Sequence, residues 1–294
     1  MVEVEGRPIK LSNLDKMLYP TGFTKAEVVD YYARIAPTIL PHLRDRALTR
    51  KRFPNGVDGP SFYEKNCPAH RPDWVGVYRI PGDEGVLEFC RIDSLAAMTW
   101  LANLAALELH TSMARATDPD APTMVVFDLD PGAPADLVDC CEVALWLRHV
   151  LASIDLECVA KTSGSKGLQV YLPLNSPATY EETAGFSRTL AQLLEREHPD
   201  KVVSLQRKTL RVGKVLIDWS QNARHKTTVC VYSLRARPRP TVSTPVTWTE
   251  VEACAGSGDA EALTFEAPQV VERVAELGDL FAPTLTLRQE PPRF

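Results

Sequence analysis

Three aspartates combine residue type and spacing in a way that can support chemistry: Asp128, Asp130 and Asp218. The first two end the apolar segment Met-Val-Val-Phe-Asp-Leu-Asp of residues 124–130, and the third follows Val-Leu-Ile in residues 215–219. Both runs are rich in β-branched residues, which predicts buried strands. Side chains at positions i and i+2 of a strand point to the same face, so Asp128 and Asp130 should project together.

Neighbouring carboxylates repel each other, and their desolvation costs free energy. A divalent cation relieves both problems, so we predict a metal site that Asp218 completes from a neighbouring strand. Such a site suits two-metal phosphoryl or nucleotidyl transfer, in which one cation activates an attacking hydroxyl and the other holds a triphosphate. The alternative is that these acids only cap strand ends. Asp218 argues against it, because three apolar residues precede it and carboxylates are rarely buried without partners.

A glycine-rich loop, Ser163-Gly-Ser-Lys-Gly167, follows the acidic strand and a predicted helix. Two glycines let backbone N–H groups converge, two hydroxyls can donate, and Lys166 supplies positive charge, so the loop can cradle an anion. The spacing is not that of a Walker A motif, and the loop joins two predicted strands, 157–162 and 168–172. An ordinary hairpin turn therefore stays open as the alternative.

Basic residues are concentrated although the net charge is −5. Residues 201–240 hold ten Lys or Arg and a single acid, Asp218, and a second basic block comprises Arg44-Asp-Arg46 followed by Arg50-Lys51-Arg52. Such blocks attract polyanions even on an acidic chain, although each alone could be solvated surface charge. Aromatic residues interleave with the second block, as base stacking requires, and core packing is the alternative for at least one of them. They are Phe53, Phe62 and Tyr63.

His110 is predicted to end an apolar helix that begins after Ser94 and runs to about Leu109. A single histidine at a helix C-terminus is either a partner of the helix dipole or a catalytic group, and the sequence leaves both open.

Seven cysteines, an odd number without a CxxC spacing, predict reduced thiols and no structural zinc. Cys67 and His70 have ligand-like spacing but lack a second pair. No apolar run reaches membrane-spanning length, and the N-terminus does not resemble a signal peptide. We therefore expect a cytoplasmic protein without a membrane partner.

The order of predicted elements indicates an α+β fold with mixed or antiparallel sheets flanked by helices. A capping box, Thr24-Lys-Ala-Glu27, opens a helix to about Leu40. A hairpin turn is expected at 81–85. Further helices are expected at about 135–154, 179–196 and 269–277, with strands dominating between the second and third of these, through residue 233.

Several motifs in a fixed order resemble one family over roughly residues 8–285: the polymerase domain of bacterial DNA ligase D, a branch of the archaeo-eukaryotic primase superfamily. The motifs are Leu-Asp-Lys-Met-Leu-Tyr-Pro at 14–20, Thr-Arg-Lys-Arg-Phe-Pro-Asn-Gly-Val at 49–57, Phe-Asp-Leu-Asp-Pro-Gly at 127–132, Thr-Ser-Gly-Ser-Lys-Gly at 162–167, Gly-Lys-Val-Leu-Ile-Asp-Trp-Ser-Gln-Asn at 213–222, Lys-Thr-Thr at 226–228 and Tyr-Ser-Leu-Arg at 232–235. The resemblance implies a single primase-polymerase domain over 1–294, with an RRM-like element in its catalytic core. Its expected parts are a DNA-contacting region (about 8–120), the core (about 121–235) and a C-terminal tail (236–294).

The resemblance also implies roles for individual residues. The three aspartates would be catalytic metal ligands for two Mn²⁺ or Mg²⁺ ions, with manganese favoured. Contacts to the incoming NTP or dNTP are implied for His110, Ser163, Ser165, Lys166, Gln221 and Arg235. Contacts to DNA are implied for Lys16, Lys25, Lys51, Arg52, Phe62, Tyr63 and Arg211. Within the second set, Lys16 and Lys25 would hold a downstream 5′-phosphate, and Arg211 would lie on a mobile loop that helps to organise the metal site.

The implied function is a template-dependent nucleotidyltransferase of DNA repair that fills short gaps or 5′-phosphorylated recessed ends, with a preference for ribonucleotides. End joining and excision repair are both open, as are a DNA ligase and an end-binding protein as partners. The hairpin at 81–85 differs in sequence from the loop that bridges DNA ends in some relatives. Whether the chain is a free-standing polymerase or one domain of a longer protein is also open.

Two other functions compete with this one. The acidic segment resembles the nucleophile strand of a haloacid-dehalogenase-type phosphatase, but Gly132 stands where that family has Thr or Val, and over 120 residues precede the motif. A non-catalytic DNA-end-binding module would use only the basic surfaces, but clustered acids facing DNA would then cost affinity.

Overall fold

The structure, a computed structural model, describes residues 1–82 and 85–292. It divides into two compact units, each assembled from three chain segments. The first unit comprises Met1–Pro119, Thr227–Ser243 and Phe265–Asp279, and the second comprises Asp120–Lys226, Thr244–Thr264 and Leu280–Phe294. Residues 236–294, expected as a tail, are thus shared by both units, and the proposed single-domain organisation stays a prediction.

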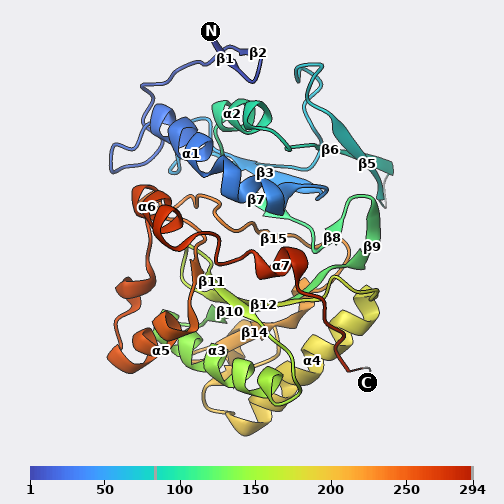
Figure 1. Cartoon of the computed structure of the whole chain (residues 1–294). Coiled ribbons are helices and arrows are strands. Elements are labelled where there is room, and N and C mark those ends of the chain that lie inside the picture. The colour runs from blue at the N-terminus through green and yellow to red at the C-terminus, as the bar shows by residue number, and fades with distance from the viewer. Residues whose placement is uncertain (83–84, 293–294) are drawn as a thin grey trace. The chain divides into compact units, whose positions relative to one another are not determined.

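The first unit contains a four-stranded antiparallel sheet in the order β15-β7-β3-β4. Its strands are β3 (Leu48–Arg52), β4 (Phe62–Glu64), β7 (Ala106–Thr111) and β15 (Thr228–Val229). Its helices are α1 (Lys25–Leu43), α2 (Leu95–Asn103) and α6 (Ala267–Leu277). Helix α1 packs against α2 and α6, and α2 packs against β7 (Figure 1).

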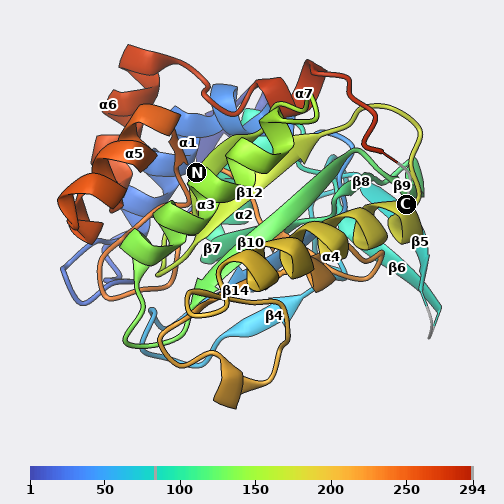
Figure 2. The same ribbon diagram turned by 90° about the horizontal axis from the view of Figure 1, so that it is seen from below.

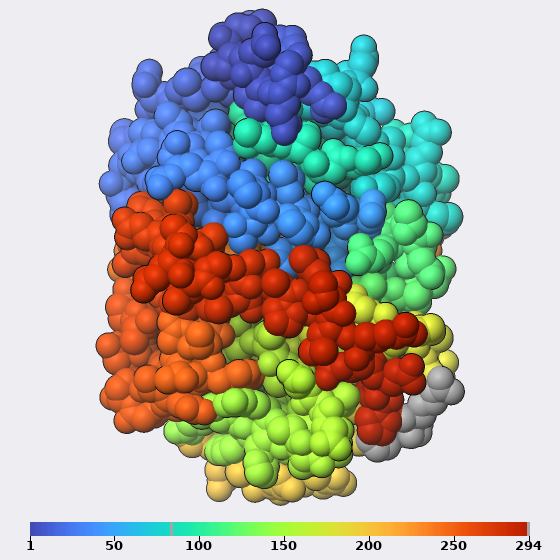
Figure 3. Space-filling view, viewed as in Figure 1, coloured from blue at the N-terminus to red at the C-terminus, as the bar shows by residue number. Residues whose placement is uncertain are grey.

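Smaller strand pairs complete the first unit. Antiparallel partners are β1 (Val2–Val4) with β2 (Arg7–Ile9), and β5 (Val77–Gly82) with β6 (Gly85–Cys90). The β1 and β2 residues stand out from the surface as a small projection (Figure 3). The β5–β6 hairpin is as predicted, but its tip, residues 83–84, lies outside the described residues. Strands β8 (Ala114–Arg115) and β9 (Asp118–Pro122) follow β7 in the chain.

The predicted capping box of α1 is confirmed. The Thr24 hydroxyl accepts a hydrogen bond from the Glu27 backbone N–H at 3.3 Å, and a Glu27 carboxylate oxygen accepts the Thr24 N–H at 2.7 Å. These two bonds satisfy donors that a helix start leaves unpaired. The apolar side chains of α1 recur at helical spacing and form its buried face.

The long helix predicted after Ser94 is wrong in its second half. Helix α2 ends at Asn103, the chain turns through Ala105 with a positive φ of 55°, and β7 begins at Ala106. Three of the first five side chains of β7 are apolar, and every residue of the strand except His110 is buried, so burial does not alternate as it does in a half-buried strand. A short apolar run of this kind cannot be told from a buried helix by periodicity alone.

The second unit is built on a six-stranded sheet in the order β13-β14-β10-β12-β11-β16. All neighbouring strands are antiparallel except β13 and β14, which are parallel. The strands are β10 (Met124–Pro131), β11 (Val159–Thr162), β12 (Leu168–Pro173), β13 (Val202–Val203), β14 (Val215–Asp218) and β16 (Pro245–Val246). Because β10 is antiparallel to both neighbours, the parallel sheet expected of a dehalogenase-type phosphatase is absent around the acidic strand.

Helices α3 and α4 lie side by side over one face of this sheet, and α5 packs against α3 (Figures 1 and 2). The helices of this unit are α3 (Leu137–Ala152), α4 (Tyr180–Glu197), α5 (Trp248–Ser257) and α7 (Pro283–Thr286), with 3₁₀ turns η1 (Lys208–Leu210), η2 (Trp219–Gln221) and η3 (Ala260–Leu263). The predicted helices and the β11–β12 hairpin are confirmed, whereas α5 was not predicted. No described helix is long and apolar enough to span a membrane.

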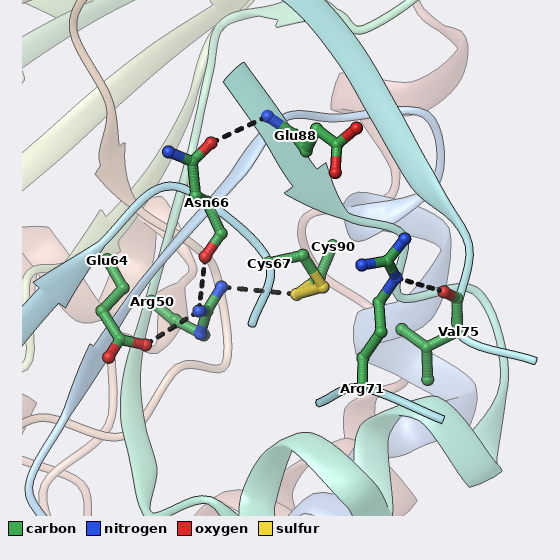
Figure 4. Close-up of a disulfide and its surroundings, with 8 residues drawn as sticks. All are labelled: Arg50, Glu64, Asn66, Cys67, Arg71, Val75, Glu88 and Cys90. Carbon is green, nitrogen blue, oxygen red and sulfur yellow. Dashed lines mark hydrogen bonds and ion pairs between the residues drawn. A yellow bond between two sulfur atoms is a disulfide. The ribbon is translucent and has the colours of Figure 1, made fainter. Parts of the chain in front are cut away.

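The expectation that all cysteines are reduced is wrong for one pair. Cys67 and Cys90 form a disulfide, with Cα atoms 4.8 Å apart, next to the buried guanidinium of Arg50 (Figure 4). Strand β6 places Cys90 beside Cys67, whose backbone N–H donates to the Glu88 carbonyl at 2.6 Å. Cysteine count and spacing could not reveal this proximity, because the two residues are 23 positions apart. The other five cysteines are free and buried, and the disulfide removes Cys67 as a zinc ligand.

We predict that replacing Cys67 and Cys90 together by Ala lowers the free energy of unfolding by about 3 kcal/mol, because the crosslink restricts the unfolded chain over a loop of this length. Dithiothreitol should lower the melting temperature of the wild type and leave that of the double variant unchanged. The disulfide would be contradicted if dithiothreitol changed neither melting temperature and if all seven thiols of the denatured wild type could be alkylated without reduction.

Candidate active site

Asp128 and Asp218 lie directly opposite each other on the antiparallel strands β10 and β14. Opposed residues in such a pair have Cα atoms roughly 4.5–5.5 Å apart. Asp130 lies two residues along β10 and so shares the face of Asp128. The chain therefore brings the three predicted carboxylates to one face of adjacent strands, and their role as metal ligands stays a prediction.

Ionisation of the Asp128 carboxyl is costly at this position. The pKa of Asp128 is raised to about 6, mainly because the carboxyl is buried. The hydrogen bond from Gln169 lowers this pKa, and the negative charge of Asp218 raises it. A positive charge placed between the two carboxylates would lower the free energy of the ionised pair. Carboxylate oxygens are also the donors that Mg²⁺ and Mn²⁺ prefer. The residues present therefore fit a divalent cation.

Each carboxylate has a side-chain partner. Asp130 forms an ion pair with Arg211, and the Lys166 ammonium lies 4.0 Å from its other oxygen. Asp218 accepts hydrogen bonds from the Ser220 hydroxyl at 2.6 Å and from the Gln221 amide at 2.8 Å.

These partners set the positions of the carboxylates. Within residues 1–82 and 85–292, no three His, Cys, Asp or Glu side chains are grouped closely enough to hold an ion. An ion that used Asp130 would have to displace the Arg211 guanidinium.

Two close backbone contacts fix the loops around β10. A Cβ atom on Gly167 would collide with the carbonyl oxygen of Leu129, which lies between the two aspartates of β10. A Cβ on Gly132 would collide with the carbonyl oxygen of Arg211. Glycine at these two positions therefore lets both the 163–167 loop and the Arg211 loop pack directly against the acidic strand.

The loop Ser163–Gly167 is a hairpin turn between β11 and β12, closed by a 2.9 Å hydrogen bond from the Ser163 N–H to the Gly167 carbonyl. The Ser163 hydroxyl accepts hydrogen bonds from the backbone N–H groups of Ser165 and Gly167, at 3.2 and 3.1 Å. These N–H groups converge on one oxygen, as they would on an anion. Lys166 is largely exposed beside them.

In the first unit, one face of the sheet gathers a second set of predicted residues. Lys51 is opposite both Glu108 and Tyr63, so these three share a face, and His110 lies two residues along β7 from Glu108. The Tyr63 ring meets the His110 ring edge-on at 5.7 Å. His110 is thus a strand residue, and its predicted place at a helix end is wrong.

Glu108 joins His110 to Arg235. Its carboxylate lies 3.0 Å from the His110 Nε2 and 3.4 Å from the Arg235 Nε, and it accepts the Ala236 N–H at 3.0 Å. Burial would raise the pKa of Glu108, but the His110 hydrogen bond and the Arg235 charge outweigh it and lower the pKa to about 2. Burial lowers the pKa of His110, although Glu108 opposes this.

The other predicted DNA contacts are distributed over two faces. Arg52 points away from the face of Lys51, because the two are consecutive in β3, and it pairs with Glu64 at 3.0 Å. The side chains of Phe62 and Tyr63 are about half exposed, so Phe62 is not a core residue.

Lys16 and Lys25 lie together. The Lys25 N–H donates to the Lys16 carbonyl, and the buried Lys25 ammonium donates to the Ser12 carbonyl at 2.7 Å. Burial, and then the charges of Lys16 and Arg52, lower the pKa of Lys25.

Comparison with protein families identifies the kind of domain that carries these residues. Residues 24–281 match the family described as "LigD, primase-polymerase domain". The chain belongs to this family. It is 42% identical over 278 residues to the multifunctional non-homologous end joining protein LigD of Mycolicibacterium smegmatis, covering 94% of this chain and 36% of the relative. The bifunctional LigD of Bacillus subtilis is 31% identical over 272 residues, covering 92% of this chain and 43% of that protein.

A solved structure is similar over nearly the whole chain. It is the polymerase domain of Mycobacterium tuberculosis ligase D in complex with DNA, with a TM-score of 0.88 and 38% identity, covering 96% of this chain and 99% of the other. The mixed α+β architecture predicted from the sequence is therefore confirmed as that of a LigD polymerase domain. The chain spans less than half the length of the curated LigD relatives described above.

Two residues of this LigD-type domain were missed by sequence reasoning. Glu108 orients the two predicted nucleotide contacts His110 and Arg235, and only its spacing of two from His110 in a strand could have indicated it. Asn222 is buried behind β10, where its amide exchanges hydrogen bonds with the N–H and carbonyl of Val126 at 2.9 and 2.7 Å. It ties the end of η2 to β10 and so fixes the segment that follows Asp218.

We predict that Glu108→Gln lowers the free energy of unfolding at pH 7 by about 3 kcal/mol, the equivalent of moving the carboxyl pKa from 4.5 to about 2. Because the folded-state pKa is lowered, this contribution is complete above pH 4.5 and is lost as the pH falls towards 2. Urea unfolding at pH 7 and at intervals from pH 5 to 3 should therefore show a shallower pH dependence in the variant.

The matched control is Glu88→Gln, which removes a carboxylate paired with the exposed Arg79 and should cost no more than about 1 kcal/mol. Equal losses in both variants would contradict a special role for the buried carboxylate.

Proposed function

We propose that this chain is a DNA-directed nucleotidyltransferase that extends a primer 3′-hydroxyl at short gaps or ends during non-homologous end joining. The observation that carries the proposal is the pairing of Asp128 with Asp218, with Asp130 on the same face, in a chain of the LigD primase-polymerase domain family. The names of the relatives support end joining as the repair pathway.

Asp128, Asp130 and Asp218 would hold two divalent cations, with manganese proposed ahead of magnesium. When bound, such ions lower the pKa of an attacking hydroxyl and stabilise charge on the triphosphate and its leaving oxygen. Arg211 would leave Asp130 as the ions bind, and its guanidinium would then be available to a phosphate. Gln221, held on Asp218 in this structure, would contact the sugar or the reacting groups.

The incoming nucleoside triphosphate would be bound by cations and N–H donors. In the 163–167 loop, the backbone N–H groups that now converge on the Ser163 hydroxyl would donate to phosphate oxygens, with Ser165 and Lys166 beside them. Arg235 and His110 would contact the same substrate, and Glu108 would hold both in place. Positive charge at these points offsets the charge that develops on the triphosphate during transfer.

DNA would be bound through the sheet of the first unit and its neighbouring lysines. The exposed Phe62 and Tyr63 rings suit stacking on bases, and Lys51 and Arg52 suit phosphate contact. Lys16 and Lys25 would hold a downstream 5′-phosphate. A DNA complex of the similar M. tuberculosis domain supports DNA as the partner. A preference for ribonucleotides, and a ligase and an end-binding protein as further partners, belong to the same proposal.

The experiment that tests this function is primer extension on a short-gap substrate with a 5′-phosphate, with Mn²⁺ and either ribo- or deoxynucleotides. Asp128→Ala should abolish nucleotide addition and leave DNA binding nearly intact, because the acids hold ions and not DNA. Asp200→Ala, which removes an exposed carboxylate outside the site, should extend primers normally. Tight DNA binding without addition by the wild type would favour a non-catalytic end-binding module instead.

Lys16→Ala should weaken binding about tenfold to gapped DNA that carries a 5′-phosphate, the loss expected for one hydrogen bond to a charged group. Binding to the same DNA without the phosphate should be unchanged in a fluorescence anisotropy titration. The control is Lys10→Ala, which removes an exposed lysine of the first unit. Equal weakening on both DNAs would show that Lys16 does not read the phosphate.

A further inference from the structure

Four polar side chains form a continuous row across four strands of the second unit. Lys161 on β11 is opposite Gln169 on β12, Gln169 is opposite Asp128 on β10, and Asp128 is opposite Asp218 on β14. Directly opposed residues share a face of a sheet, so this polar row places a cation, an amide and two carboxylates next to one another. Lys161 and Gln169 are only 1% and 3% exposed, and burial of such polar groups costs free energy unless they are hydrogen-bonded.

Hydrogen bonds connect the first three members of the polar row. The Lys161 ammonium donates to the Gln169 Oε1 at 2.5 Å, and the Tyr171 hydroxyl donates to the same oxygen at 3.3 Å. The Gln169 Nε2 donates to the Asp128 Oδ1 at 3.0 Å. The Lys161 ammonium also lies 5.4 Å from the centre of the Tyr171 ring.

These bonds determine which end of the Gln169 amide faces Asp128. An ammonium group can only donate, so Lys161 must be met by the amide oxygen and not by the NH₂ group. The NH₂ group is therefore turned towards Asp128, where it donates to the carboxylate. Without Lys161, the amide could rotate and present its oxygen to Asp128, which would repel the carboxylate that binding requires.

We propose that Gln169 is a positioning residue for divalent cation binding by Asp128, and that Lys161 and Tyr171 act through it by fixing the direction of its amide. The proposal rests on the metal role of Asp128 stated above. The Gln169 amide donates to one carboxylate oxygen of Asp128 and thereby orients the group. Groups that orient metal ligands in this way typically change metal affinity 10- to 100-fold when removed.

The test measures Mn²⁺ binding directly, by electron paramagnetic resonance titration of free Mn²⁺ with purified full chain. Gln169→Leu should weaken Mn²⁺ binding about 10- to 100-fold, and Lys161→Met should weaken it in the same direction. In primer extension, both variants should show a raised KM for Mn²⁺ and a kcat near that of the wild type at saturating Mn²⁺. A residue that only supports the sheet would not produce this separation.

The packing control is Val170→Ala, which shortens a fully buried side chain of β12 that points to the opposite face from the polar row. It should lower the melting temperature and leave Mn²⁺ affinity unchanged. The proposal would be overturned if the loss of Mn²⁺ affinity simply followed the loss of melting temperature in all three variants, Val170→Ala, Gln169→Leu and Lys161→Met.

Failure of this proposal can be told from failure of the metal assignment. If the wild type binds Mn²⁺ and the Asp128→Asn variant does not, the metal role of Asp128 is established. Gln169→Leu with wild-type affinity would then overturn the positioning role alone. Equal Mn²⁺ binding by wild type and Asp128→Asn would instead remove the metal role on which both proposals stand.

Discussion

Repulsion between carboxylates brought together on adjacent strands is the interaction on which the acidic site depends. The register of β10 and β14 sets Asp128 against Asp218, and burial makes their charges more costly. Neighbouring side chains stabilise the carboxylates. Arg211 and Lys166 form ion pairs with Asp130, Ser220 and Gln221 donate hydrogen bonds to Asp218, and Gln169 donates one to Asp128. A cation between Asp128 and Asp218 would replace the repulsion of these two carboxylates by attraction to both, whereas an ion on Asp130 would have to displace Arg211.

In the first unit the charges are reversed: one buried carboxylate holds two basic side chains. Its predicted nucleotide contacts, His110 and Arg235, are drawn to one buried carboxylate, Glu108, which stays ionised because both neighbours favour its charge. Fixing a guanidinium and an imidazole before a polyanion arrives lowers the ordering cost of binding. The same carboxylate also holds the Ala236 N–H, so side-chain placement and backbone placement are coupled at this point.

Local patterns were enough to predict the elements that position the acids. The apolar run into Asp128, the capping box of α1, and the hairpin around the 163–167 loop each depend on neighbouring residues only. Elements buried on both faces were harder to predict: β7 is buried at every residue except His110 and was taken as the end of a helix. Helix α5 lies in the segment that was expected as a C-terminal tail.

Contacts made across strands could not be predicted, because register is a property of the folded sheet. Nothing near Glu108 in the sequence indicates Arg235, and nothing near Asp128 indicates Gln169 or Lys161. The Cys67–Cys90 disulfide was missed for the same reason, since β6 alone brings the two cysteines together. The strand pattern and the family resemblance singled out the three aspartates, but the side chains that contact them became visible only with strand pairing.

The most direct measurement of the central claim is anomalous diffraction at the manganese absorption edge, from crystals grown with Mn²⁺ and a non-hydrolysable nucleoside triphosphate. The account predicts anomalous peaks within coordination distance of the Asp128 and Asp218 carboxylates, with the Arg211 guanidinium no longer paired with Asp130. Ordered nucleotide with no anomalous density at these aspartates, and Arg211 still paired with Asp130, would contradict it.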